Sequence, residues 1–145
     1  MLLPKKITLC VFADGGAINN PGPAAVGFVV KKKGRTIKKL AKYIGETTNN
    51  VAEYTAVIEA LKWLKSNINP PAGEPASSIQ FFLDSKLVVN QLNGLFKIKD
   101  WKMRNLAIKV RGLEREAGGN ILYCHIPREK NVEADSLVKS VLMKR

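Results

Sequence analysis

The order of strand-like and helix-like segments most constrains how this chain can fold. Short apolar runs rich in β-branched and aromatic residues indicate strands, and apolar residues repeating near a spacing of 3.6 indicate helices. The predicted strands cover residues 7–13, 24–32, 35–44, 79–83 and 121–126, and the predicted helices cover 51–66, 85–95, 100–117 and 132–143. The first three strands, joined by turns, predict an antiparallel meander, and the later helices predict parallel crossovers. We therefore expect an α/β fold with a mixed sheet.

The length and the apolar pattern bound the class of protein. A chain of 145 residues predicts a single domain, residues 1–145, with one core. No apolar run is long enough to span a bilayer, and the first residues lack the apolar region of a secretion signal. Cys10 and Cys124 lie in separate predicted strands without nearby Cys or His ligands, so we expect two buried, reduced thiols. These features favour the cytoplasm and predict no membrane partner.

The charge of the chain points to a polyanionic partner. Twenty-four Lys and Arg residues stand against 12 Asp and Glu residues, which gives a formal net charge of +12. A strongly basic balance of this kind is typical of proteins that bind nucleic acid. On charge alone, another polyanion, an anionic membrane surface or a merely basic soluble protein are alternatives.

Four acidic residues occupy the ends of predicted elements. Asp14 and Asp84 each follow a predicted strand, whereas Glu53 and Asp135 lie in the first turns of predicted helices. Each has a local explanation: Asp14 can form a turn, Asp84 can cap the following helix, Glu53 can complete a capping box with Asn50, and Asp135 can oppose a helix dipole. Taken singly, none of them requires a functional role.

Taken together, the four acids predict a metal site. Ligands of open α/β sheets bind beyond the carboxyl ends of the strands, often beside helix starts, so these side chains can converge on one edge of the sheet. Converging carboxylates repel one another unless a cation lies between them, and oxygen ligands of this kind suit Mg²⁺ or Mn²⁺. Two such ions can catalyse phosphodiester hydrolysis. A basic protein with an acidic metal pocket has the profile of a nuclease.

The acids belong to four motifs that follow one another along the chain: Asp14–Gly16 with Asn20–Ala24, Thr47–Tyr54, Asp84–Val88 and His125–Asp135. In these motifs, and from about Ile7 to Leu142, the sequence resembles type 1 ribonuclease H. The resemblance implies the ribonuclease H-like fold, a five-stranded mixed sheet flanked by about four helices. It also implies an endonuclease that cuts the RNA strand of an RNA/DNA hybrid with little sequence preference and leaves 5′-phosphate and 3′-hydroxyl ends.

The same resemblance implies the cofactor and the substrate contacts. Asp14, Glu53, Asp84 and Asp135 would hold two Mg²⁺ ions, with Mn²⁺ as a substitute, and a monomer suits the family. The residues expected to contact the hybrid are Gly15, Gly16, Asn20, Thr48, Asn49, Asn50, Lys86 and Trp101. The short polar side chains of Asn20, Thr48 and Asn50 can donate hydrogen bonds to phosphate or sugar oxygens, and glycine lets the backbone approach closely. Trp101 can instead be an anchor in the core.

Two residues compete for an auxiliary catalytic role. His125 lies ten residues before Asp135, as does a catalytic histidine in many bacterial members of the family, but its surroundings resemble a strand end and not a mobile loop. Arg128 lies in the following loop and can bring a cation to the scissile phosphate or the leaving group. We favour Arg128. The chain also departs from the family pattern in its basic segment 96–104, which is short where many relatives carry a longer basic protrusion.

Two other functions compete with the nuclease. A non-catalytic nucleic-acid-binding module can use the same fold, but the complete set of acids argues against it. A related nuclease or strand transferase of the same superfamily shares an acidic site, but Thr48, Asn49 and Asn50 match the family that cuts hybrids. Additional cleavage of double-stranded RNA stays open.

Overall fold

The computed structural model describes residues 8–68, 78–118 and 120–144. In chain order the elements are β1 (Thr8–Ala17), β2 (Gly22–Lys32), β3 (Arg35–Thr47), α1 (Asn49–Asn67), β4 (Ser78–Leu83), α2 (Lys86–Leu92), α3 (Trp101–Ala117), β5 (Asn120–His125), the 3-10 turn η1 (Arg128–Lys130) and α4 (Val132–Leu142). This order confirms the predicted α/β class. Residues 69–75, whose proline and glycine predict a loop, lie outside the described residues.

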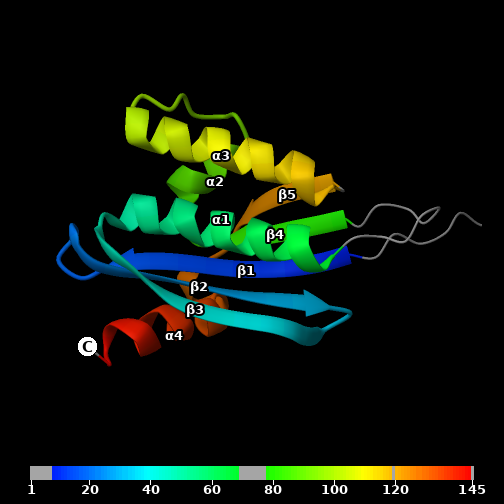
Figure 1. The fold of residues 1–145 in the computed structure, drawn as a ribbon, viewed down its shortest axis with the longest axis horizontal. Helices are drawn as coiled ribbons and strands as arrows, with labels where there is room; N and C mark the ends of the chain where they lie inside the picture. Colours follow the sequence, from blue (N-terminus) through cyan, green and yellow to red (C-terminus); the bar gives the residue numbers. More distant parts are fainter. Residues whose placement is uncertain (1–7, 69–77, 119, 145) are drawn as a thin grey trace, which may run out of the picture.

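The five strands form one mixed sheet in the order β3-β2-β1-β4-β5. The pairs β1–β2 and β2–β3 are antiparallel, whereas β1–β4 and β4–β5 are parallel. Helices α1, α2 and α3 lie on one face of the sheet and α4 lies on the other (Figure 1). The parallel neighbours β1 and β4 therefore end at the same edge.

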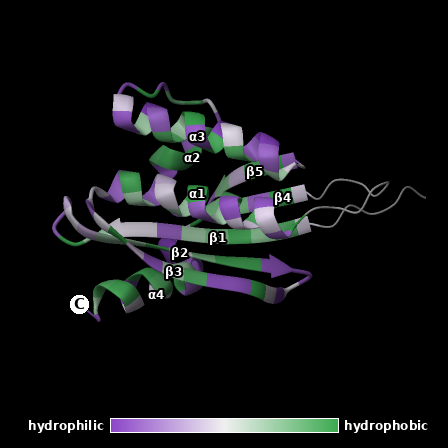
Figure 2. Cartoon of the chain, viewed as in Figure 1, coloured by the Kyte–Doolittle hydropathy of each residue, from purple (hydrophilic) through white to green (hydrophobic). Residues whose placement is uncertain are grey.

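The main core lies between the sheet and α1. Alternate residues of β1, Leu9, Val11 and Ala13, are fully buried against this helix, as the two-residue repeat of a strand requires. Helix α1 contributes Tyr54 and Leu61 from its buried side. Figure 2 shows hydrophobic residues of β1 and β4 inside the molecule and hydrophilic stretches on β3 and α3. The second face of the sheet is covered by α4 over β1, β2 and β3.

Strand β1 is longer than predicted. The prediction ended it at Ala13, because Gly15 and Gly16 are typical of turns, but β1 continues to Ala17. It continues because β2 stays paired with it as far as Ala17, although the pairing with β4 stops at Ala13. Asp14 therefore lies inside β1, and the prediction that it follows the strand is wrong.

The helix starts also differ from prediction. Helix α1 begins at Asn49 with Thr48 as its N-cap, so Glu53 lies in the second turn and forms no capping box with Asn50. Helix α2 is capped by the Ser85 side chain and not by Asp84, and it ends at Leu92, three residues before the predicted end. In both helices a hydroxyl group accepts the first backbone hydrogen bond: Thr48 lies before the predicted start of α1, and Ser85 is the residue predicted to begin α2.

The sequence predicts two buried, reduced cysteines and no segment that spans a membrane. Cys10 and Cys124 are free, as expected, but they are half-buried and not buried, because they lie on the face of the sheet opposite α1. Among the described helices, none is long and apolar enough to cross a membrane.

Candidate active site

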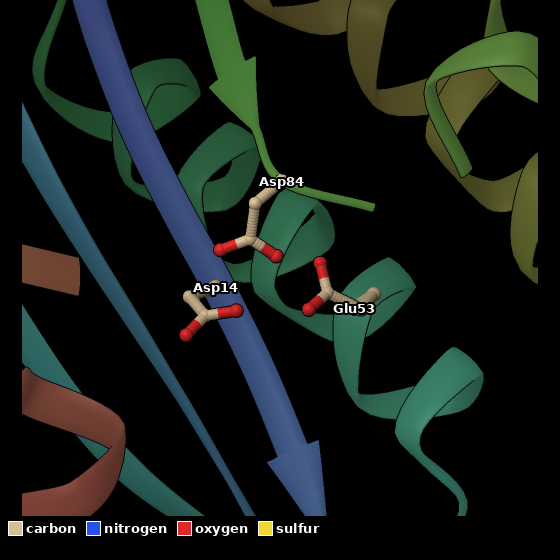
Figure 3. A group of neighbouring side chains, drawn as sticks. All are labelled: Asp14, Glu53 and Asp84. Atoms are coloured by element: carbon tan, nitrogen blue, oxygen red, sulfur yellow. The ribbon is translucent and has the colours of Figure 1, made fainter. Parts of the chain in front are cut away.

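Three acids from three separate elements meet at one edge of the sheet. Asp14, Glu53 and Asp84 each place a carboxylate oxygen within 4.8 Å of the other two. Asp14 and Glu53 are buried and Asp84 is half-buried. Figure 3 shows the three carboxylates turned toward one another from β1, α1 and the end of β4.

The backbone explains why Asp14 and Asp84 meet. The last parallel pair of β1 and β4 joins Ala13 to Leu83, so each acid is the next residue on its own strand. Beyond this pair β4 ends while β1 continues, which leaves space beside β1 for the Asp84 side chain. The two acids therefore lie together although Asp14 is inside a strand.

Glu53 reaches the other two acids because α1 lies unusually close to β1. A Cβ atom on Gly15 would lie 2.2 Å from the carbonyl oxygen of Ala52, a distance that no side chain tolerates. The Gly15 N–H donates a hydrogen bond of 3.3 Å to Oε1 of Glu53. Gly15 therefore sets the distance between α1 and β1, in addition to the backbone contact with RNA expected from the sequence.

The three carboxylates cannot all be ionised easily without a counter-charge. The pKa of Asp14 is raised to about 6, mainly by burial and also by the charges of Asp84 and Asp135, against the lowering effect of hydrogen bonds with Glu53 and the Gly15 backbone. Burial and the charge of Asp14 raise the pKa of Glu53 well above its ordinary value.

The donor set suits a hard divalent cation. Oε2 of Glu53 is buried and has no hydrogen-bond partner among the described residues, which is costly for a carboxylate oxygen. A cation placed between the three acids would satisfy this oxygen and offset the repulsion. Oxygen-only ligands of this kind fit Mg²⁺ or Mn²⁺.

Two further predicted catalytic residues line the same cavity, which has a volume of about 380 Å³. Asp135 lies in the first turn of α4, as predicted, but stands outside the group of three and pairs through Oδ2 with Nζ of Lys139 at 2.9 Å. Arg128 reaches the cavity from η1. His125 is the last residue of β5, as its surroundings predicted, and it is exposed and does not line this cavity.

A second cavity, of about 520 Å³, adjoins the first and shares Asn50 with it. Its lining includes Asn20, Thr48 and Trp101. Trp101 is 69% exposed, so the alternative that it anchors the core is wrong. Lys86, the first residue of α2, is exposed and lines neither cavity.

Hydrogen bonds join the residues between the two cavities. Oδ1 of Asn20 accepts from the Asn49 N–H at 2.9 Å, and Oδ1 of Asn49 accepts from the Ala17 N–H at 2.7 Å. These bonds tie the β1–β2 turn to the start of α1. Asn49, Gly15 and Gly16 also line the first cavity. The predicted substrate-contact residues other than Lys86 therefore line one or both cavities.

Sequence reasoning missed two residues that shape this site, Gly27 and Asn131. Gly27 lies in the middle of β2, where a Cβ atom would lie 2.7 Å from Cβ of Leu137 on α4. A glycine within an apolar strand indicates that another element approaches closely, so the sequence alone could have identified Gly27. Asn131 precedes α4 and is 1% exposed. Its signal was weaker, because an Asn before a helix is typical of ordinary capping.

Comparison with known proteins gives a consistent result. Residues 6–142 match the RNase H family. The chain is 33% identical over 132 residues to a bifunctional protein of Mycobacterium tuberculosis, covering 90% of this chain and 34% of that protein. It is 35% identical over 132 residues to ribonuclease HI of Halobacterium salinarum, covering 90% of this chain and 62% of that protein. The chain thus spans less than two thirds of both relatives.

Solved structures agree with the sequence matches. The structure of LC11-RNase H1 in complex with an RNA/DNA hybrid has a TM-score of 0.84 and 38% sequence identity, covering 91% of this chain and 94% of that one. RNase H1 from the halophilic archaeon Halobacterium salinarum NRC-1 has a TM-score of 0.86 and 32% identity, covering 95% of this chain and 99% of that one.

Proposed function

This chain belongs to the type 1 ribonuclease H family, and we propose that it is an endonuclease that hydrolyses the RNA strand of an RNA/DNA hybrid. The observation that carries the proposal is the convergence of Asp14, Glu53 and Asp84, with Asp135 and Arg128 lining the same cavity. A non-catalytic binding module has no use for buried carboxylates that repel one another. The expected products have 5′-phosphate and 3′-hydroxyl ends.

The proposed cofactor is Mg²⁺, with Mn²⁺ as a substitute. Asp14, Glu53, Asp84 and Asp135 would hold two ions. When bound, such ions supply the positive charge that an attacked phosphodiester and its leaving oxygen require. The separate position of Asp135, which pairs with Lys139, suits a ligand that serves only one of the two ions.

Arg128 is the proposed auxiliary group. Its guanidinium is always charged and can reach a phosphate at the rim of the acidic cavity that it lines. It would there offset charge on the scissile phosphate as the leaving group departs. His125, at the end of β5, lies outside the residues that line this cavity.

The second cavity is the proposed site for the backbone of the DNA strand. Thr48 caps α1 by accepting from the Val51 N–H at 3.2 Å, which leaves the hydroxyl proton for a phosphate oxygen. Asn50 lies between the two cavities and can contact the hybrid from either side. The exposed indole of Trp101 offers a flat apolar surface for a deoxyribose. LC11-RNase H1, a structural neighbour, binds an RNA/DNA hybrid.

These contacts are made with the sugar-phosphate backbone of the hybrid. We therefore expect recognition of duplex shape and the 2′-hydroxyl, with little dependence on base sequence. Lys86 would contribute a longer-range contact from the start of α2. A net charge of +12 would attract the phosphate backbone generally. Double-stranded RNA would be a second substrate only if the second cavity tolerates a ribose in place of a deoxyribose.

The test uses one 5′-labelled RNA strand in three forms: single-stranded, paired with DNA and paired with RNA. Each is incubated with the protein and Mg²⁺, Mn²⁺ or EDTA. Cleavage of the hybrid that depends on the metal is expected, and cleavage of the RNA duplex would add the second substrate. Failure of the folded protein to cut the hybrid under any of these conditions would contradict the proposed function.

A further inference from the structure

Asn131 lies between η1 and α4 and does not act as its position suggests. It occupies the N-cap position of α4, where an Asn side chain usually accepts a hydrogen bond from the first turn of the helix. In this protein its side chain makes no capping bond. The side chain is instead buried, with the residue 1% exposed.

The Asn131 side chain joins two strands at the acidic cluster. Its Nδ2 donates to the carbonyl oxygen of Ala13 at 2.9 Å and to Oδ2 of Asp84 at 3.2 Å. Its backbone carbonyl accepts from the Asp135 N–H at 3.0 Å. One residue is therefore bonded to Asp84, to Asp135 and to the residue that precedes Asp14.

This arrangement is unfavourable by itself. The capping bond is given up, and Oδ1 of Asn131 is buried without a hydrogen-bond partner among the described residues. A buried polar atom without a partner destabilises a fold, so a different gain must offset it. The two bonds from Nδ2 supply that gain, and the one to Asp84 also restrains a carboxylate that Asp14 repels.

We propose that Asn131 is a positioning residue that orients the Asp84 carboxylate toward the cation; the proposal rests on the proposed function. Asp84 follows the end of β4, so no strand pairing restrains its side chain beyond Leu83. By holding Oδ2, the amide restricts rotation of the carboxylate and directs it toward Asp14 and Glu53. A carboxamide suits this role because it donates a hydrogen bond without introducing a positive charge that would compete with the metal.

The test measures Mg²⁺ binding directly, by isothermal titration calorimetry of the full chain without nucleic acid. Asn131→Ala removes the amide, and Asn131→Leu removes it at similar volume, which keeps the test valid where the smaller side chain fails to fold. Loss of a partner that orients a metal ligand typically weakens metal binding or activity by about 10- to 100-fold. We expect a loss of Mg²⁺ affinity in that range, with an unchanged KM for the hybrid and a fall in kcat at low Mg²⁺ that high Mg²⁺ reverses.

Glu133→Gln is the matched control. Glu133 also holds the first turn of α4 to the sheet, through Lys31 at 2.7 Å and Lys39 at 3.4 Å, but it does not contact Asp84. Its loss should loosen α4 slightly and leave Mg²⁺ affinity within about twofold of the wild type, as for an exposed ion pair. If Asn131 has a purely structural role, Asn131 and Glu133 variants that lose the same thermal stability should have the same Mg²⁺ affinity.

The wild-type protein supplies a second measurement that needs no substitution. The side-chain amide protons of Asn131, followed by NMR, should shift during a Mg²⁺ titration with the same midpoint as the calorimetry. The proposed role of Asn131 would be overturned if both Asn131 variants kept the Mg²⁺ affinity of the wild type, or if the amide signals did not shift when Mg²⁺ binds. Neither result would contradict the proposed function. Wild-type protein that neither binds Mg²⁺ nor cuts the hybrid would overturn the proposed function itself.

Discussion

Gly27 pairs with Asp14 across β1 and β2. Because Gly27 has no side chain, α4 packs directly against the sheet at this residue. A Cβ atom at residue 27 would lie 2.7 Å from Cβ of Leu137 and 2.9 Å from the carbonyl oxygen of Ala134. Helix α4 carries Asp135 in its first turn. The position of the fourth acid therefore depends on a glycine in a different element.

The Gly27→Ala substitution tests this dependence. Because the methyl group would meet backbone and Cβ atoms, α4 must shift, and we expect a loss of about 1–3 kcal/mol in the free energy of unfolding. Denaturant unfolding provides the measurement. Gly112→Ala in α3 is the control, since a Cβ atom there would meet no atom closer than 4.0 Å, and alanine should stabilise a helix interior by about 0.5–1 kcal/mol. Equal effects of the two substitutions would contradict the close packing of α4.

Replacing one acid by its amide should separate binding from cleavage. Asp84→Asn keeps the shape of the side chain and removes the charge that would hold a cation, so we expect hybrid cleavage to fall by on the order of 1000-fold or more. Hybrid affinity should be retained or improved, because less negative charge faces the phosphates. Single-turnover cleavage and electrophoretic mobility shift measure the two quantities. Cleavage near the wild-type rate would remove Asp84 from the proposed metal ligands.

The order of the elements could be predicted from local patterns, and the convergence of three acids could be predicted from that order. Apolar periodicity distinguishes strand from helix, and parallel neighbours present their carboxyl ends at one edge. The end of β1 could not be predicted, because it depends on pairing with β2 and not on the turn-forming Gly15 and Gly16. The role of Asn131 was hidden for a similar reason: its partner Ala13 is 118 residues away.

Arg128 and His125 can be ranked by paired substitutions. Arg128 lines the acidic cavity and His125 does not, so Arg128→Ala should lower kcat by about 10- to 100-fold while His125→Ala changes it by less than about threefold. Arg128→Lys, which keeps the charge without the planar guanidinium, should recover part of the loss. Steady-state kinetics at saturating hybrid provide the comparison. A larger effect at His125 would reverse the assignment.

The stability of the metal-free protein should fall as pH rises. The pKa of Asp14 is about 6 in the folded protein, against an ordinary value of 3.8. The folded state therefore binds more protons than the unfolded state between these values, and stability is lost as pH rises through this window. The raised pKa of Glu53 acts in the same direction. The lowered pKa of the exposed Glu133 acts in the opposite direction, below pH 4.5, where its salt bridges are lost as pH falls.

The Asp14→Asn variant tests this effect. It carries no titrating group at residue 14, so its stability relative to the wild type should increase between pH 4 and pH 7, by on the order of 3 kcal/mol for a pKa raised from 3.8 to about 6. Thermal unfolding in EDTA across this pH range measures the difference, with Glu46→Gln, a change at an exposed acid on β3, as the control. Added Mg²⁺ should raise the Tm of the wild type far more at pH 8 than at pH 5, because the cation must displace the protons that Asp14 and Glu53 hold at low pH. A stability difference that does not vary with pH would mean that the carboxylates are already balanced by protein groups, and the case for a cation between them would be lost.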